Sequence, residues 1–99
     1  MKTAIYHPEA EAELHEAARW YEGRSVGLGD QFLDAVEKGL EKVLRSPESW
    51  GILRGDVRYY HLPRFPYAIL FQVRGEGVFI VAIMHLSRQP EYWTGRTED

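Results

Sequence analysis

The residues of this chain that could take part in chemistry lie where a long apolar segment ends. His85 follows the apolar residues 78–84, and Arg88 comes three positions later. A histidine can donate or accept a proton near neutral pH, and an arginine can hold a phosphate group. Arg64, in the aromatic turn upstream, could supply a second cation. The candidates for catalysis are therefore His85, Arg88 and Arg64.

Each of these side chains also has a plainer interpretation. A histidine at the end of a strand often makes structural hydrogen bonds, and an arginine near a proline can organise a turn through carboxylates or carbonyls. His7, His15 and His61 have no metal-ligand spacing, and no glycine-rich phosphate loop or Ser/His/Asp arrangement is present. The residues alone assign no catalytic role, and they predict neither a metal nor a cofactor.

Charge divides the chain into an acidic part and a basic part. Residues 1–49 hold 6 Lys/Arg against 10 Asp/Glu, whereas residues 50–93 hold 5 Arg against 3 acids, in a chain of net charge −3. An anionic partner should therefore meet the second part, although the overall balance is unlike that of most nucleic-acid binders. We predict that partner or target binding uses Arg58, Arg64, Arg88, Tyr92, Trp93 and Arg96. Solvated arginines and packing aromatic residues are the alternative.

A β-hairpin is the element that must position these residues. Two apolar segments, residues 67–73 and 78–84, flank a short connection that holds Gly75 and Gly77. In the second segment the even-numbered and the odd-numbered residues are both apolar, which is typical of a central strand covered on both faces. The helices upstream can cover one face of the sheet. Tyr92 and Trp93 could fold back over the other face, or a partner could cover it.

Two helices precede this hairpin, over residues 8–23 and about 29–45. Pro8 and the acidic residues after it suit a helix start, and Gly23 is expected as the C′ residue that ends the first helix. The four glutamates of the first helix, Glu9, Glu11, Glu13 and Glu16, are expected to form a solvated face. Gly39 of the second helix is expected to pack closely against Ala17 and Ala18 of the first.

The predicted fold is α+β and has two layers, a small mainly antiparallel sheet packed against an N-terminal αα-hairpin. A short strand opens the chain, and residues 57–62 form another before the hairpin, so the order is β-α-α-β-β-β with a short C-terminal turn or helix. The 99 residues are expected to form one domain with a frayed tail at 94–99. The chain has no cysteine and no apolar run near the roughly 20 residues of a membrane span, so a cytoplasmic domain is expected.

Several motifs resemble the RelE/ParE superfamily, the toxins of bacterial type II toxin–antitoxin modules, and are closer to its ParE-like branch. The matching residues are Tyr21-Glu22, Gly27-Leu28-Gly29-Asp30-Gln31-Phe32-Leu33, Arg64-Phe65-Pro66-Tyr67 and His85-Leu86-Ser87-Arg88-Gln89-Pro90-Glu91-Tyr92-Trp93-Thr94-Gly95-Arg96. They span most of the chain in the expected order. The resemblance implies a growth-inhibiting toxin of the kind that stabilises plasmids, and a cognate antitoxin that wraps and neutralises it.

The resemblance also implies one of two targets, DNA gyrase or messenger RNA cut on the ribosome. Ribonuclease-type members carry an arginine early in the strand after the aromatic turn, where this chain has Ala68. The chain also has no lysine after Lys42, and the scattered arginines of its second half can hold phosphate but serve poorly as the base that metal-free RNA cleavage needs. We therefore expect a non-enzymatic gyrase poison. A ribosome-dependent endoribonuclease and an inactive domain that only binds its antitoxin are the alternatives, and a toxin dimer or a larger toxin–antitoxin complex is possible.

Overall fold

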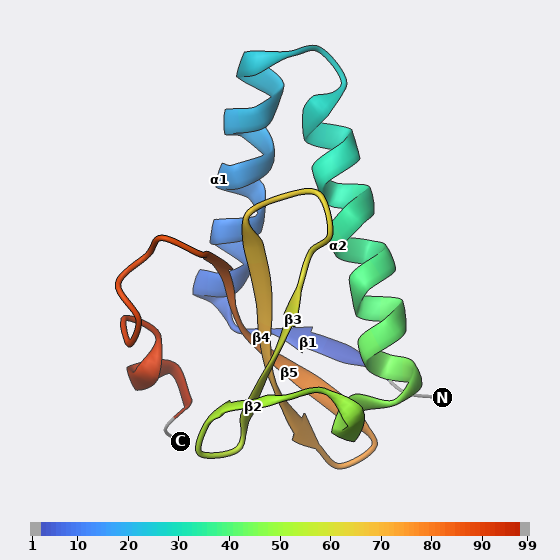
Figure 1. The fold of residues 1–99 in the computed structure, drawn as a ribbon, viewed down its shortest axis with the longest axis vertical. Helices are drawn as coiled ribbons and strands as arrows, with labels where there is room; N and C mark the ends of the chain where they lie inside the picture. Colours follow the sequence, from blue (N-terminus) through green and yellow to red (C-terminus); the bar gives the residue numbers. More distant parts are fainter. Residues whose placement is uncertain (1–2, 98–99) are drawn as a thin grey trace.

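The computed structural model describes residues 3–97, which form two helices and a five-stranded sheet (Figure 1). The elements in chain order are β1 (Ala4–Tyr6), α1 (Pro8–Arg24), α2 (Leu28–Arg45), the 3-10 helix η1 (Pro47–Ser49), β2 (Ile52–Arg54), β3 (Val57–His61), β4 (Tyr67–Arg74), β5 (Gly77–His85) and the 3-10 helix η2 (Thr94–Thr97). The strand order across the sheet is β1-β5-β4-β3-β2, with β1 parallel to β5 and all other pairs antiparallel. The predicted α+β fold is confirmed.

The sheet has one strand more than the sequence predicted. Ile52–Arg54 pairs with β3 at the edge and gives the order β-α-α-β-β-β-β in place of β-α-α-β-β-β. Three residues are too few to show an alternating pattern, and all three are exposed, so this strand leaves no apolar periodicity to detect.

The predicted hairpin is present as β4 and β5, with Gly75 at φ 58 in its turn. The residues of β5 do not alternate regularly between the two faces of the sheet. Leu70 pairs with Ala82 but Phe71 pairs with Ile80, so Val81 is the extra residue of a β-bulge. Beyond the bulge the two faces exchange: Ile83 joins the core under the helices, and Ala82 joins the opposite face.

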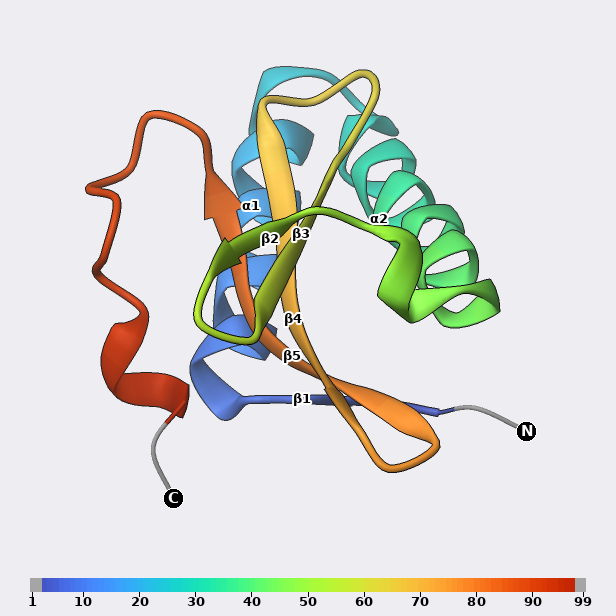
Figure 2. The ribbon, with the colours of Figure 1, turned by 60° about the horizontal axis from the view of Figure 1, so that its bottom comes forward.

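We call residues 86–97, which follow β5, the C-terminal segment. The helices and this segment lie on opposite sides of the sheet (Figure 2). On the side away from the helices, the Trp93 side chain is only 2% exposed and packs in a cluster with Val57, Ala68, Leu70, Val81 and Ala82. Of the two ways we considered to cover this face, the structure shows folding back of the chain itself.

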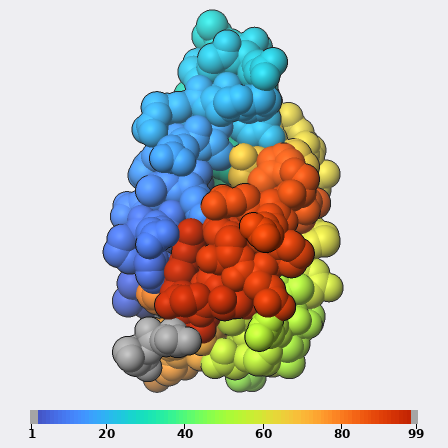
Figure 3. Space-filling view, turned by 90° about the vertical axis from the view of Figure 1, so that its left-hand side faces the viewer, coloured from blue at the N-terminus to red at the C-terminus, as the bar shows by residue number. Residues whose placement is uncertain are grey.

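The C-terminal segment lies beside α1 on the surface shown in Figure 3. The expectation of a frayed tail from Thr94 is wrong for the residues that the structure describes, because Thr94–Thr97 form η2. Thr97 donates from its hydroxyl to the Thr94 carbonyl, and Arg96 reaches α1 and β5. Residues 98 and 99 of the predicted tail lie outside the described range.

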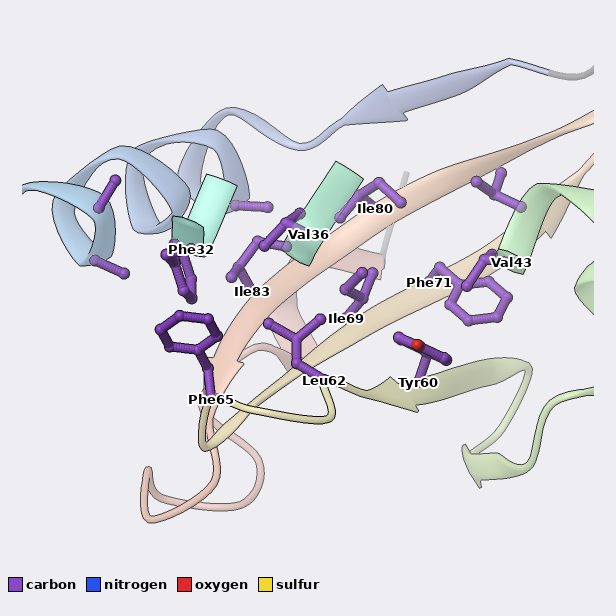
Figure 4. Packing of buried hydrophobic residues seen from close by; sticks show 14 residues of the cluster. Phe32, Val36, Val43, Tyr60, Leu62, Phe65, Ile69, Phe71, Ile80 and Ile83 are labelled. Carbon is purple, nitrogen blue, oxygen red and sulfur yellow. The ribbon is translucent and has the colours of Figure 1, made fainter. Parts of the chain in front are cut away.

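The main core lies between the helices and the sheet (Figure 4). Its fully buried side chains come from both layers and include Phe32, Val36, Val43, Ile69, Phe71, Ile80 and Ile83. Tyr21 extends this core with an aromatic cluster, since its ring centroid lies 5.3 Å from that of Phe32 and 4.9 Å from that of Phe65. Burial of these rings and aliphatic chains supplies the main driving force for folding.

Two glycines have different roles from those predicted. Gly39 faces the sheet, where a Cβ atom would lie 2.7 Å from the Tyr60 ring and 3.2 Å from Ile69, and not against α1 as expected. The close contact between the helices is at Gly29, where a Cβ atom would lie 2.6 Å from the Ala18 carbonyl oxygen. Gly23 does not end α1, which continues to Arg24 with Ser25 as its C-cap.

Glu22, near the end of α1, caps the N-terminus of α2. The α2 N-cap residue, Gly27, has no side chain for the purpose, and the amides of Gly27 and Gly29 both donate to the Glu22 carboxylate at 2.9 Å. These two hydrogen bonds lower the pKa of Glu22 below its usual value. The negative charge also lies at the positive end of the α2 dipole.

We predict that Gly39→Leu lowers the free energy of unfolding by about 1–3 kcal/mol, because the larger side chain must displace Tyr60 and Ile69. The matched control is Gly23→Leu, since nothing lies within 4 Å of a Cβ atom at Gly23. It should gain up to about 1 kcal/mol of helix propensity. Urea unfolding measures both. Equal effects of the two substitutions would contradict the packing of Gly39 on the sheet.

We predict that Glu22→Gln lowers the melting temperature at neutral pH, because a neutral amide oxygen replaces the carboxylate cap. The pKa of Glu22 is lowered in the folded state, so its contribution is fully present above about 4.5 and is lost as the pH falls through the folded value. The difference between the two proteins should therefore shrink with acidification below this range. Glu41→Gln, on the exposed surface of α2, is the control. A difference that does not change with pH would contradict the carboxylate cap.

Candidate functional site

A groove of about 610 Å³ runs along α1. One side is formed by α1 and the other by the residues that enter β4 and leave β5. Its lining residues are Glu13, Glu16, Ala17, Trp20, Tyr21, Pro66, Tyr67, Ile83, His85 and Arg88. We call this hollow the α1 groove. It brings together two residues that the sequence selected, His85 and Arg88, with carboxylates and aromatic rings that it did not.

His85 is held by the turn that follows β5. Its Nδ1 accepts from the Ser87 amide at 3.1 Å and lies 2.8 Å from the Ser87 hydroxyl. The imidazole also packs edge-on against the Tyr67 ring, with 5.0 Å between centroids. These contacts are those of a structural histidine at a strand end, and they leave Nε2 as the ring nitrogen without a role in the turn.

Arg88 lies at the same end of the groove and is half exposed. Its guanidinium stacks on the Tyr92 ring at 3.9 Å from the centroid, and its Nη1 lies 4.0 Å from the Glu13 carboxylate. Stacking on an aromatic face holds a guanidinium in place without using all its hydrogen-bond donors. Arg88 therefore keeps donors for a partner.

The other predicted cations lie elsewhere. Arg64 donates to the Gln31 side chain at 2.9 Å and lines a separate hollow along α2. Arg58 donates to the Trp50 carbonyl at 2.6 Å. The three candidates for catalysis are thus divided between two hollows, with His85 and Arg88 in one and Arg64 in the other.

Arg96 binds within the chain. Its side chain is 9% exposed, and Nη2 donates to Glu13 at 2.8 Å and to Glu9 at 3.3 Å. Its Nη1 donates to the Val81 carbonyl at 3.1 Å. Despite desolvation, the Glu13 carboxylate raises the pKa of Arg96, so the guanidinium is charged in its buried position.

Glu13 completes this arrangement, and the expectation that it belongs to a solvated helix face is wrong. Its Oε1 accepts from the Ile83 amide at 3.0 Å while Oε2 accepts from Arg96. The bulge at Val81 explains these partners. It turns the Val81 carbonyl and the Ile83 amide towards the edge of β5 that the short β1 leaves open. Glu13 and Arg96 therefore satisfy the exposed edge with side chains.

The two aromatic residues before Arg96 pack against this pair and against the sheet. Burial, and then the nearby Glu13 charge, raise the pKa of the Tyr92 hydroxyl, so it stays neutral. The Trp93 indole nitrogen donates to the Pro90 carbonyl at 3.0 Å. Trp93 and Arg96 thus anchor the C-terminal segment, and their side chains are turned into the protein.

The described residues contain neither a metal-binding cluster nor a membrane-spanning helix. Among residues 3–97, no group of three or more His, Cys, Asp or Glu side chains could hold a metal ion. No helix in that range is long and apolar enough to cross a membrane. Glu16 and Trp20 were missed as groove residues because a helical periodicity reports which side chains are buried, not which exposed ones border a hollow.

Comparison with known proteins identifies the family. Residues 4–90 match the family model described as "ParE toxin of type II toxin-antitoxin system, parDE". The chain therefore belongs to the ParE toxin family, within the RelE/ParE superfamily, as its motifs indicated.

A solved structure titled "Chromosomal ParDE TA system from P. aeruginosa" has a similar fold. The TM-score is 0.63 at 24% sequence identity, and the match covers 88% of this chain and 98% of the other. No curated protein matches the sequence.

We predict that Glu13→Gln lowers the free energy of unfolding by about 2–4 kcal/mol, because it leaves the buried Arg96 charge without its main partner. Glu9→Gln is the matched control. Glu9 contacts the same guanidinium but its side chain is 70% exposed, so the loss should stay below about 1 kcal/mol. Hydrogen exchange should also show faster exchange at the Ile83 amide in Glu13→Gln. Similar losses in the two variants would contradict the Glu13–Arg96 anchor.

Proposed function

We propose that this ParE-family toxin acts by poisoning DNA gyrase and is held inactive by a cognate antitoxin. Family membership supports the toxin role. The ParDE system named in the family description includes an antitoxin, which supports a bound antitoxin as the inactive state. The choice of gyrase over messenger RNA rests on the α1 groove.

The observation that favours a protein target is the charge of that groove. His85 and Arg88 share it with the carboxylates of Glu13 and Glu16. An RNA strand entering there would bring its phosphates against two carboxylates, one of them neutralised by Arg96. Like charges that meet in this way oppose binding.

The positions of the catalytic candidates support the same choice. Cleavage of RNA without a metal needs an acid, a base and cations around one phosphate. Arg64 lies in a different hollow from His85, and the Nδ1 atom of His85 is used by Ser87. A poison that only binds its target does not need these groups to meet.

Target and partner contacts are proposed at the exposed cations of the second half of the chain. Arg88 and Arg64 each keep an exposed side chain beside a hollow, with Arg58 on the adjacent strand β3 and Tyr92 under Arg88. Trp93 and Arg96 would contribute by holding the C-terminal segment in place.

Expression of the toxin without antitoxin should halt DNA replication and induce the DNA-damage response, while messenger RNA stays intact. A gyrase poison leaves broken DNA, whereas a ribosome-dependent ribonuclease leaves cut codons. Primer extension on translated messages, run beside a DNA-damage reporter, separates the two. Cuts within codons and a silent reporter would overturn the proposal in favour of the ribonuclease.

His85→Ala supplies a second discriminator in the same cells. A ribonuclease that used His85 as its acid would lose about 10²–10⁴ in rate. A poison should retain its toxicity to the extent that its fold survives, which a thermal melt of the purified variant measures. Glu41→Gln, at an exposed position of α2 that lines neither hollow, is the control for expression level.

A further inference from the structure

The hollow along α2 that Arg64 lines is basic, although the chain as a whole is acidic. We call it the α2 hollow, and its volume is about 280 Å³. The charged residues of its lining are three cations, Lys38, Lys42 and Arg64, and one carboxylate, Asp34. In a chain of net charge −3, this local surplus of positive charge favours an anionic ligand.

The three cations are available to such a ligand. Lys38 and Lys42 are exposed, and neither side chain makes a hydrogen bond or ion pair to residues 3–97. Arg64 donates to the neutral side chain of Gln31, and a guanidinium has further donors to offer. Lys42, in the last turn of α2, also suits the negative end of the helix dipole. Lys38 lies two turns before the helix ends, so the dipole does not explain its position.

A tyrosine hydroxyl without a partner belongs to the same hollow. Tyr60 lines it and is only 8% exposed, and its hydroxyl makes no hydrogen bond to the described residues. Its ring can lie against α2 because residue 39 is glycine, where a Cβ atom would be 2.7 Å from the ring. The hydroxyl of so buried a tyrosine usually has a partner, and a ligand oxygen in the hollow would supply one.

The donors reach the hollow from three parts of the chain. Lys38 and Lys42 lie about one turn apart on α2, Tyr60 belongs to β3, and Arg64 lies in the turn after β3. A phosphate group has oxygens on several sides and accepts from several directions, whereas a carboxylate accepts mainly in one plane. Lysine and arginine are also the usual partners of phosphate. The donor set therefore favours a phosphate over a carboxylate.

The size of the hollow indicates what carries the phosphate. Pockets that enclose a whole small ligand have volumes of roughly 300–1,000 Å³, and the α2 hollow lies below that range. Its aromatic side chain, Tyr60, is too buried to stack on a nucleobase and packs edge-on against Trp50, with 5.0 Å between centroids. The hollow therefore suits one phosphate of a longer backbone, bound without regard to base sequence.

We propose that the α2 hollow binds a backbone phosphate of duplex DNA, with Lys38, Lys42 and Arg64 as its cations and the Tyr60 hydroxyl as a neutral donor. The choice of DNA as the source of the phosphate rests on the proposed function, because a gyrase poison acts on an enzyme that holds DNA. The toxin then contacts both the enzyme and its DNA. One phosphate site on an acidic protein binds weakly alone, so the contact adds to binding by gyrase and does not replace it.

The test is a nuclear magnetic resonance titration of isotope-labelled, full-length toxin with a short DNA duplex of arbitrary sequence at low salt. The amide signals of Lys38, Gly39 and Lys42 should shift and saturate. Lys38→Gln and Lys42→Gln should each weaken binding about fivefold or more. Arg19→Gln is the matched control, because it removes the same charge from an exposed position of α1 outside the hollow, and it should bind within twofold of the unaltered toxin.

Tyr60→Phe tests the site without changing its charge. It removes the hydroxyl and keeps the ring beside Gly39, so binding should weaken about tenfold, as for a lost hydrogen bond to a charged group, while the melting temperature stays the same. No saturable shift with the duplex would overturn the proposal. Duplex binding that is unaffected by Tyr60→Phe and by both lysine variants would overturn it as well.

Inorganic phosphate and ATP are the probes for a different source of the phosphate. The duplex should bind more tightly than either, because it offers many equivalent phosphates and releases condensed counterions. Equal or tighter binding of ATP would assign the hollow to free nucleotides and contradict the proposal. Lysine variants that lose affinity for the antitoxin, in a toxin that shows no shift with DNA, would assign the hollow to an acidic protein segment and contradict it too.

The titration contains no gyrase, so its result separates this inference from the proposed function. A toxin that binds the duplex through the α2 hollow but traps no gyrase cleavage complexes would contradict the proposed function alone. A toxin that traps gyrase with full potency after replacement of both Lys38 and Lys42 by glutamine would contradict this inference alone.

Discussion

The structure depends on how the open edge of β5 is satisfied beyond the end of β1. β1 covers only Val78 to Ile80, and the bulge at Val81 turns the next carbonyl and amide towards solvent. Unpaired groups on a central strand would cost stability and invite pairing with another chain. Glu13 and Arg96 bind these groups and each other, which joins α1, β5 and the C-terminal segment. The same pair places Trp93 over the second face and sets the wall of the α1 groove.

The motifs that suggested the family are largely explained by folding. Glu22 caps α2 through the amides of Gly27 and Gly29, and Gly29 leaves room for the Ala18 carbonyl. Tyr21, two glycines and an acid are therefore parts of one helix–helix junction, with Tyr21 packed on Phe32. Residues with such structural roles identify the fold and say little about the target. The groove residues Glu16 and Trp20 belong to no such motif.

The sequence predicted the long elements well and the local exceptions poorly. Helix and strand periodicity placed α1, α2, β4 and β5, because each turns an apolar stripe towards the core, which in α1 consists mainly of alanines. Three features remained hidden. The three-residue strand β2 is too short for a pattern, the bulge at Val81 adds one apolar residue among others, and Glu13 looks like any surface glutamate until its partner at Arg96 is known. For the site, His85 and Arg88, which the sequence selected, line one groove, but the sequence could not show that Glu13 and Glu16 lie beside them.

If this toxin poisons gyrase, as we propose, it binds a protein and does not cut RNA. The most direct measurement mixes the purified toxin with purified gyrase, ATP and a supercoiled plasmid, and then releases trapped cleavage complexes with detergent and protease. Gyrase poisoning should give linear plasmid that increases with toxin concentration, is absent without gyrase and is suppressed by prior addition of the antitoxin. Supercoiling that proceeds without linear product, together with codon-specific cleavage when the same toxin is added to translating ribosomes, would contradict it.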